Sequence, residues 1–268
     1  MGLVLLFPKS MIAPGVILPA TAWSVIRMIQ SGAFWFWPVF TGIMGILLAL
    51  FALLFAASAS LQKVLDILYQ KLDPVGMTEK LEPVLQHLKA GSPRRPQLTA
   101  HLSNAYGAAG DYECAFSILD DMERNNTAKE PNLEALVLSN RCALYLQQEN
   151  TMAARASLDQ LTALISGGNG RRLNPKLAAG AESLRLRLSF LEGAEDNLDY
   201  LFMEIRQCNN PLRRVNFRYL LARVADRKND WNLASAQYEK VAKAAPKLAV
   251  GKNAGERLKA LSVSTSVG

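Results

Sequence analysis

The stretch GDYECAFSILDD, residues 110–121, decides the fold because it joins two helical patterns through a short turn. Apolar residues at helical spacing precede Gly-Asp, and an aromatic residue, an alanine and further apolar residues at helical spacing follow it. The same order returns in NDWNLASAQYEKV, residues 229–241, where Ala234 corresponds to Ala115. The sequence therefore predicts a helical hairpin that recurs along an all-α chain.

Two weaker copies of the pattern lie between these stretches. ENTMAARASLDQL, residues 149–161, places Ala154 in the alanine position. GAEDNLDYLFMEI, residues 193–205, places Leu198 there. The intervals between the four positions fit helical-hairpin repeats with loops of unequal length.

The recurring residues suit the packing of such hairpins. Two helices approach closely only where a small side chain lies at their crossing, so we expect Ala115, Ala154 and Ala234 at the crossings. We expect Tyr112 and Trp231, which precede two of these alanines, to fill the wedge between neighbouring hairpins. One hairpin cannot bury its own apolar face, so several must stack.

These residues resemble the tetratricopeptide repeat, a helical hairpin of about 34 residues. The Gly-Asp-Tyr turn at 110–112, the small residue after it, Tyr106 in the preceding helix and Pro246 after the last hairpin match that pattern. The resemblance implies a TPR-like α-solenoid of stacked antiparallel helical hairpins over residues 95–262. Other α-solenoids built from paired helices are the alternative.

The resemblance also implies a peptide-binding groove lined by the first helix of each hairpin. The residues that match groove positions are Asn104, Asn140, Arg187, Tyr219 and Arg223. In one subclass of the family, asparagines and basic residues of this groove hold the carboxylate of a partner's C-terminus. The basic residue expected early in the first helix is replaced here by Ala100. Arginines and a tyrosine in a groove favour an acidic peptide, whereas the alternative is that they are solvated or face anionic lipid.

The N-terminal part of the chain predicts a membrane anchor over residues 1–60. No charged residue lies between Arg27 and Lys63, and residues 37–59 are long enough to cross a bilayer as a helix. Trp35 and Trp37 suit the headgroup region. Residues 11–29 form a second apolar segment, in which two prolines would kink a helix. This segment is either a second membrane span or a re-entrant or interfacial segment, so the sequence predicts one or two transmembrane helices.

The remaining boundaries follow from breaks in the helical pattern. Residues 61–94 predict a stalk or a first helical hairpin broken at Asp73-Pro74, and residues 263–268 predict a frayed tail. The cysteines form no CxxC pair, which is typical of reduced thiols. Two membrane spans would place both chain ends in the cytoplasm, so we expect the repeats on the cytoplasmic face.

No motif predicts a catalytic, cofactor or metal site. His87 and His101 are isolated, and the sequence has neither a phosphate-binding glycine loop nor a nucleophile elbow. Neighbouring carboxylates such as Asp120 and Asp121 point in different directions on a helix and are expected to be solvated.

The sequence thus predicts a membrane-anchored, non-catalytic scaffold or adaptor that binds a protein or peptide partner. One alternative is a structural subunit of a membrane complex that contacts partners through its transmembrane segment. A lesser alternative is an enzyme on a helical scaffold. The net charge of +7 and the pI of 9.4 would suit nucleic acid, but aromatic residues are not interleaved with the basic ones as base stacking requires. The identity of the partner and the oligomeric state stay open.

Overall fold

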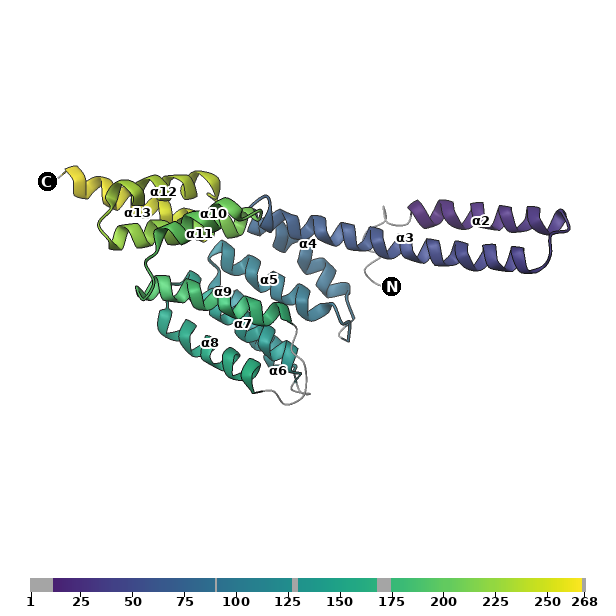
Figure 1. The fold of residues 1–268 in the computed structure, drawn as a ribbon, viewed down its shortest axis with the longest axis horizontal. Coiled ribbons are helices and arrows are strands. Elements are labelled where there is room, and N and C mark those ends of the chain that lie inside the picture. Colours follow the sequence, from purple (N-terminus) through teal and green to yellow (C-terminus); the bar gives the residue numbers. More distant parts are fainter. Residues whose placement is uncertain (1–11, 90, 127–129, 168–174, 267–268) are drawn as a thin grey trace. The chain divides into compact units, whose positions relative to one another are not determined.

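The computed structural model describes residues 12–89, 91–126, 130–167 and 175–266, and within these ranges the regular secondary structure is helical, without strands. The all-α prediction is therefore confirmed for the described chain (Figure 1). The helices are α2 (Ile12–Gln30), α3 (Phe36–Tyr69), α4 (Pro74–His87), α5 (Arg95–Ala109), α6 (Tyr112–Arg124), α7 (Pro131–Gln147), α8 (Thr151–Ser166), α9 (Pro175–Glu192), α10 (Leu198–Gln207), α11 (Pro211–Arg227), α12 (Trp231–Ala244) and α13 (Ala249–Ser266).

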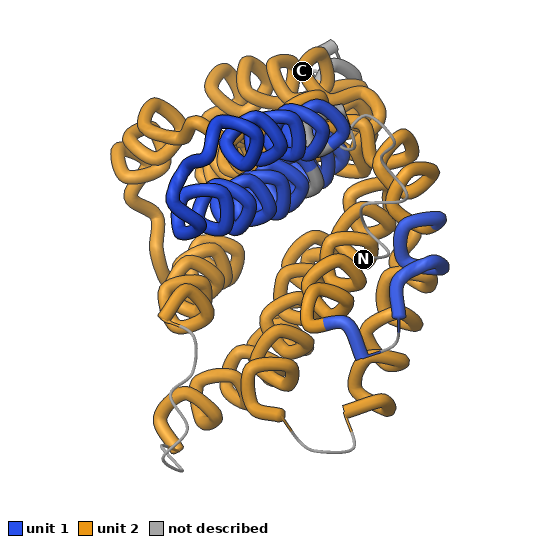
Figure 2. The backbone as a smooth tube through the Cα atoms, turned by 90° about the vertical axis from the view of Figure 1, so that its right-hand side faces the viewer, with its two compact units in different colours: residues 1–65, 83–92 blue, residues 66–82, 93–268 orange. Residues whose placement is uncertain are grey.

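The backbone divides into two compact units, which Figure 2 colours separately. The first unit comprises residues 1–65 and 83–92, and the second comprises residues 66–82 and 93–268. Helices α3 and α4 each contribute residues to both units. The predicted repeats lie in the second unit.

In the first unit, α2 and α3 run antiparallel beside each other (Figure 1). A glycine permits their close approach, because a Cβ atom at Gly45 would lie 2.1 Å from the Cγ2 atom of Thr21. The Thr41 hydroxyl also donates to the Met28 sulfur at 3.5 Å. The outward side chains are apolar and exposed; on α3 they include Val39, Phe40, Ile43, Ile46, Leu47, Leu50, Phe51, Leu54 and Phe55.

Helix α3 is the one helix in the described part of the chain that is long and apolar enough to cross a membrane, by length and composition. It is 34 residues long, whereas about 20 residues suffice to cross the hydrocarbon core. It contains the predicted span 37–59 and continues through the start of the predicted stalk. The second predicted segment, 11–29, falls on α2, apart from residue 11, which lies outside the described residues.

The helical structure is interrupted between α3 and α4, where the sequence predicts a break at Asp73-Pro74. Leu72 adopts a positive φ of 57°, which few residues other than glycine adopt readily. The Asp73 side chain then accepts a hydrogen bond from the Gly76 N–H at 3.3 Å, so it satisfies a donor in the first turn of α4. Lys247, far along the chain, contacts the other oxygen of this carboxylate at 2.8 Å.

Three hairpins of the second unit share one turn geometry. The first helix ends at a residue in the left-handed region, and the next residue caps the second helix with its side chain. The left-handed residues are Gly110 (φ 96°), Glu149 (φ 60°) and Asn229 (φ 60°). The capping residues are Asp111, Asn150 and Asp230, whose side chains accept hydrogen bonds from the backbone N–H groups of Cys114, Ala153 and Leu233.

The alanines of these hairpins lie where the two helices pack. Ala115, Ala154 and Ala234 are fully buried, each four residues after its capping residue. In the first hairpin the buried Ser103 hydroxyl donates to the Ala115 carbonyl at 2.9 Å, which links α5 to α6 at this point. The burial agrees with a small side chain at a close helix crossing.

The third hairpin departs from the predicted alignment. Its turn begins at Gly193 (φ 83°), but its capping residue is Asn197, so three extra residues separate the two. The residue four positions after the cap is Leu201, which is fully buried, and not the half-buried Leu198 of the sequence alignment. A leucine keeps two helices further apart than an alanine does, and α10 has its main helix contacts with α11 and not with α9.

The aromatic wedge prediction is wrong for Trp231. Tyr112 is half-buried and packs against the cluster around Ala115, but Trp231 is 45% exposed. Trp231 is the first residue of α12, and α13 packs on this helix without covering the indole.

The buried core runs along the stack in separate clusters. One joins the first hairpin to α7, one joins the second hairpin to α9, and one joins α9 through Phe190 to α10 and α11. Each cluster thus contacts only neighbouring hairpins, as expected for stacked repeats. Helix α13 packs on α12 and also contacts α5, so the end of the stack meets its beginning.

Candidate ligand-binding cavities

Three cavities lie within the second unit, with volumes of about 460, 830 and 120 Å³. We call them the Arg187 cavity, the Glu149 cavity and the Asn104 cavity after one residue in each. Helices α13 and α5, at the two ends of the stack, contact each other and help to enclose the space in which these cavities lie. Four of the five groove residues predicted from the sequence line these cavities.

The Arg187 cavity is formed by α7, α9 and α11 together with the last residue of α3, Tyr69. Its polar lining includes Ser139, Ser183, Arg187 and Asn216, and its apolar lining includes Leu184, Leu212 and Phe217. Ser183 and Arg187 are four residues apart and therefore share one face of α9. The cavity thus combines hydrogen-bonding groups with an apolar wall, as ligand sites commonly do.

The Arg187 guanidinium has no hydrogen bond or ion pair with any described residue, although it is enclosed by protein. Its side chain remains partly exposed to the cavity. Desolvation by burial lowers the pKa of Arg187 from its ordinary value, and the positive charge of Arg213 adds to this effect. A partly desolvated guanidinium without an acceptor favours an anionic ligand, because a charge-assisted hydrogen bond would stabilise its charged form.

Arg213 lines the same cavity but is already paired. Its guanidinium donates to the Glu204 carboxylate at 3.1 Å and lies 5.2 Å from the centre of the Phe217 ring. The Tyr200 hydroxyl donates to the same carboxylate at 3.0 Å. Arg213 therefore adds little free positive charge to the cavity.

In the Glu149 cavity, the two predicted residues are occupied by an acidic residue of the chain itself. The Tyr219 hydroxyl and the Arg223 guanidinium donate to the Glu149 carboxylate at 3.1 and 2.5 Å. Burial, with a contribution from Glu149, raises the pKa of Tyr219 to about 12. This cluster fixes the turn between α7 and α8 to α11, so its charges are balanced within the chain.

The two predicted asparagines are placed differently. Asn104 lines the Asn104 cavity beside Tyr69, whose hydroxyl lies 2.7 Å from the His101 Nδ1 atom. Asn140 is buried, and its amide donates to the Leu136 carbonyl of its own helix at 2.7 Å. The two asparagines and the three other predicted residues therefore do not converge on one site.

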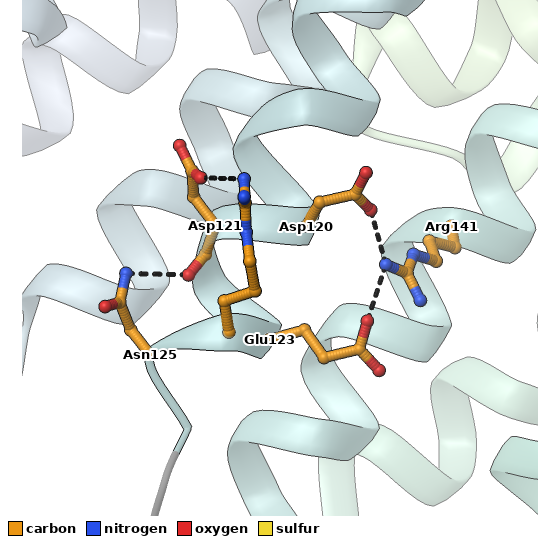
Figure 3. Close-up of polar contacts among 6 residues, drawn as sticks. Asp120, Asp121, Glu123, Asn125 and Arg141 are labelled. Carbon is orange, nitrogen blue, oxygen red and sulfur yellow. Dashed lines mark hydrogen bonds and ion pairs between the residues drawn. The ribbon is translucent and has the colours of Figure 1, made fainter.

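The acidic residues of α6 form contacts between hairpins (Figure 3). The Arg141 guanidinium, from α7, donates to Asp120 at 2.5 Å and to Glu123 at 2.7 Å. Asp121 points away from Asp120 and pairs instead with Arg124 of its own helix. Asp120 is thus part of an ion-pair network across the hairpin boundary and is not merely solvated, as the sequence suggested.

No group of three or more histidine, cysteine, aspartate or glutamate side chains is arranged to hold a metal ion among the described residues. The three cysteines are free thiols; Cys142 is buried, Cys208 is half-buried and Cys114 is exposed. Burial raises the pKa of Cys142 to about 11, so this thiol is protonated at neutral pH and is a poor nucleophile.

Sequence reasoning identified Arg187 but missed its polar neighbours Ser139, Ser183 and Asn216. The four-residue spacing of Ser183 and Arg187 was an available signal for one of them. The other two come from different helices and could be placed beside Arg187 only by the fold. No family model, curated protein or solved structure matches this chain.

Proposed function

We propose that the chain is a membrane-anchored, TPR-like scaffold whose stacked hairpins bind a protein or peptide partner without catalysing a reaction. In this proposal α3 crosses the membrane, and the hairpins form a solenoid whose inner side receives the partner on the cytoplasmic face. The packing of neighbouring helix pairs supports the proposed scaffold of stacked hairpins. The length and apolar composition of α3 support the proposed membrane anchor.

The observation that carries the proposal is the Arg187 cavity. Arg141 and Arg223 are paired with carboxylates of the chain, whereas the enclosed Arg187 has no such partner among the described residues. The Arg187 side chain is partly exposed to the cavity, beside hydroxyl and amide groups that have no partner among the described residues. An acidic partner would supply an acceptor for this guanidinium.

A second candidate is a structural subunit that contacts its partners through the membrane helices. The apolar side chains of α3, such as Ile43 and Phe51, are exposed. They are available to another transmembrane helix as well as to lipid, and this availability favours the alternative. The two candidates predict different segments to be essential for binding.

The test is to isolate the full chain from native membranes after cross-linking and to compare the partners of three variants. Arg187→Glu reverses the unpaired charge, and Arg185→Glu is its matched control. Arg185 lies on the same helix, but it is exposed and pairs with Glu182. In the third variant an unrelated transmembrane helix replaces residues 36–58.

We expect Arg187→Glu to lose the partner, whereas Arg185→Glu and the replaced helix retain it. If Arg187→Glu retains the partner and the replaced helix loses it, the scaffold proposal is wrong and the membrane-subunit alternative is favoured. Arg223 is unsuitable for this experiment, because a glutamate there would face Glu149 and disturb the fold.

A further inference from the structure

We infer that the Arg187 cavity binds a single carboxylate group carried by a peptide segment of the partner, with the guanidinium of Arg187 as its principal contact. This inference rests on the proposed function and specifies the chemistry of its ligand. It concerns Arg187 with Ser139, Ser183 and Asn216, and it does not involve the predicted asparagines.

The charge of the cavity favours a monoanion. Among the residues that line it, Arg187 and Arg213 carry positive charge, and none is an aspartate or glutamate. Glu204 neutralises Arg213 from outside the lining. One positive charge is left, which a carboxylate balances and a phosphate dianion would exceed.

The hydrogen-bonding groups of the cavity suit a carboxylate. A guanidinium can donate two parallel N–H groups to one carboxylate, and these charge-assisted hydrogen bonds are about twice as strong as those between neutral groups. The hydroxyls of Ser139 and Ser183 and the amide of Asn216 have no hydrogen-bond partner among the described residues, although all three line the cavity. They can donate to a carboxylate oxygen or to the peptide group beside it.

The size and the apolar wall of the cavity limit the ligand. A volume of about 460 Å³ lies at the lower part of the usual range for small ligands, about 300–1,000 Å³. It accommodates the end of a peptide or an acidic side chain with its neighbour, but not a folded domain. Leu184, Leu212 and Phe217 can cover the aliphatic part of that residue.

Two sources supply a carboxylate of this kind: the C-terminus of the partner, or an aspartate or glutamate side chain within it. The test separates them with three synthetic pools of random hexapeptides. One pool has a free C-terminus and no acidic residue, one has an amidated C-terminus and one glutamate, and one is amidated and lacks acidic residues. Each is offered to the full chain in lipid nanodiscs, and the retained peptides are quantified by mass spectrometry.

We expect the chain to retain one or both carboxylate pools and not the pool without a carboxylate. Arg187→Gln should weaken retention about 10- to 100-fold, the range for a lost charge-assisted hydrogen bond. Arg187→Lys should weaken it less, because lysine keeps the charge but not the paired N–H groups. Arg185→Gln, on the same helix, should leave retention unchanged.

A stability measurement distinguishes a ligand-binding role for Arg187 from a structural one. In the free protein the melting temperature of Arg187→Gln should be close to that of the unsubstituted chain, because the substitution removes no hydrogen bond or ion pair to a described residue and the Arg187 side chain is partly exposed. A lower melting temperature would mean that Arg187 supports the fold, which contradicts the inference.

Three binding results would overturn the inference: retention of no pool, equal retention of the pool without a carboxylate, or displacement of bound peptide by inorganic phosphate or dimethyl phosphate more readily than by acetate. None of them decides the proposed function. That function fails only if Arg187→Glu retains the native partner in the cross-linking experiment.

Discussion

Substitution of Ala154 by leucine tests the packing that defines the repeats. Ala154 is fully buried in the cluster that joins the second hairpin to α9, together with Leu138 and Leu158. Leucine adds three carbon atoms at the crossing of α7 and α8. They can be accommodated only if the two helices move apart or neighbouring side chains leave their preferred rotamers.

The expected magnitude follows from two opposing terms. Burying three more carbons would stabilise the fold by about 2.4 kcal/mol, at about 0.8 kcal/mol for each. Overpacking of a dense core nevertheless destabilises a protein by about 1–3 kcal/mol in total. The strain at this crossing is therefore about 3–5 kcal/mol, and Ala154→Leu should lower the free energy of unfolding by about 1–3 kcal/mol.

The matched control is Ala156→Leu, two residues further along α8. Ala156 is exposed, so this substitution should change the free energy of unfolding by no more than about 0.5 kcal/mol. Both variants are compared by urea denaturation in mild detergent, with the loss of helical circular dichroism as the signal. Equal stability of the two variants would show that no close crossing lies at Ala154, and the alignment of the repeats on this alanine would be wrong.

The third hairpin provides the opposite substitution, because Leu201→Ala should leave a cavity at the equivalent position and lower the free energy of unfolding by about 2–5 kcal/mol. Burial lowers the pKa of His101 below 6.5, so the unfolded chain binds a proton at a higher pH than the folded chain, and stability should fall as the pH drops through about 6.5. His101→Gln should flatten this dependence in urea midpoints measured on both sides of that pH. Arg141→Met removes two ion pairs to carboxylates that are more than half exposed, so it should lower the free energy of unfolding by about 1 kcal/mol, and less in high salt. Gly45→Leu should separate α2 from α3. The measurement is the yield of a disulfide between Met28→Cys and Thr41→Cys in a chain without other cysteines, which Gly45→Leu should reduce. An unchanged disulfide yield would contradict the packing of these two helices.

The hairpins could be predicted from the sequence where their turns are short. In the first, second and fourth hairpins the capping residue directly follows the left-handed residue, so the distance from the turn to the buried alanine is constant. The third hairpin inserts three residues between Gly193 and Asn197. Counting from Gly193 gives Leu198, whereas counting from the helix cap gives Leu201. The position of the cap depends on the backbone and not on the glycine.

The candidate site could be predicted only in part, because charge pairing depends on residues far apart in the sequence. Arg187 and Arg223 are indistinguishable as groove residues in the sequence. In the fold, Glu149, located 74 residues before Arg223, balances the charge of Arg223. Arg187 has no such partner among the described residues. The sequence therefore predicts which arginines face inward, but not which of them are available to a ligand.

This difference in charge pairing also explains why the cluster of Glu149, Tyr219 and Arg223 is a poor candidate for ligand binding. The Glu149 cavity is larger than the Arg187 cavity and contains two of the predicted residues. A ligand carboxylate there would have to displace Glu149 from Arg223 and would face the negative charge that it displaced. In the Arg187 cavity an incoming carboxylate displaces no acceptor among the described residues, and it meets a guanidinium that is partly exposed to the cavity. Ligand binding is therefore favoured at the smaller cavity, because a free charge and not the available volume determines the gain.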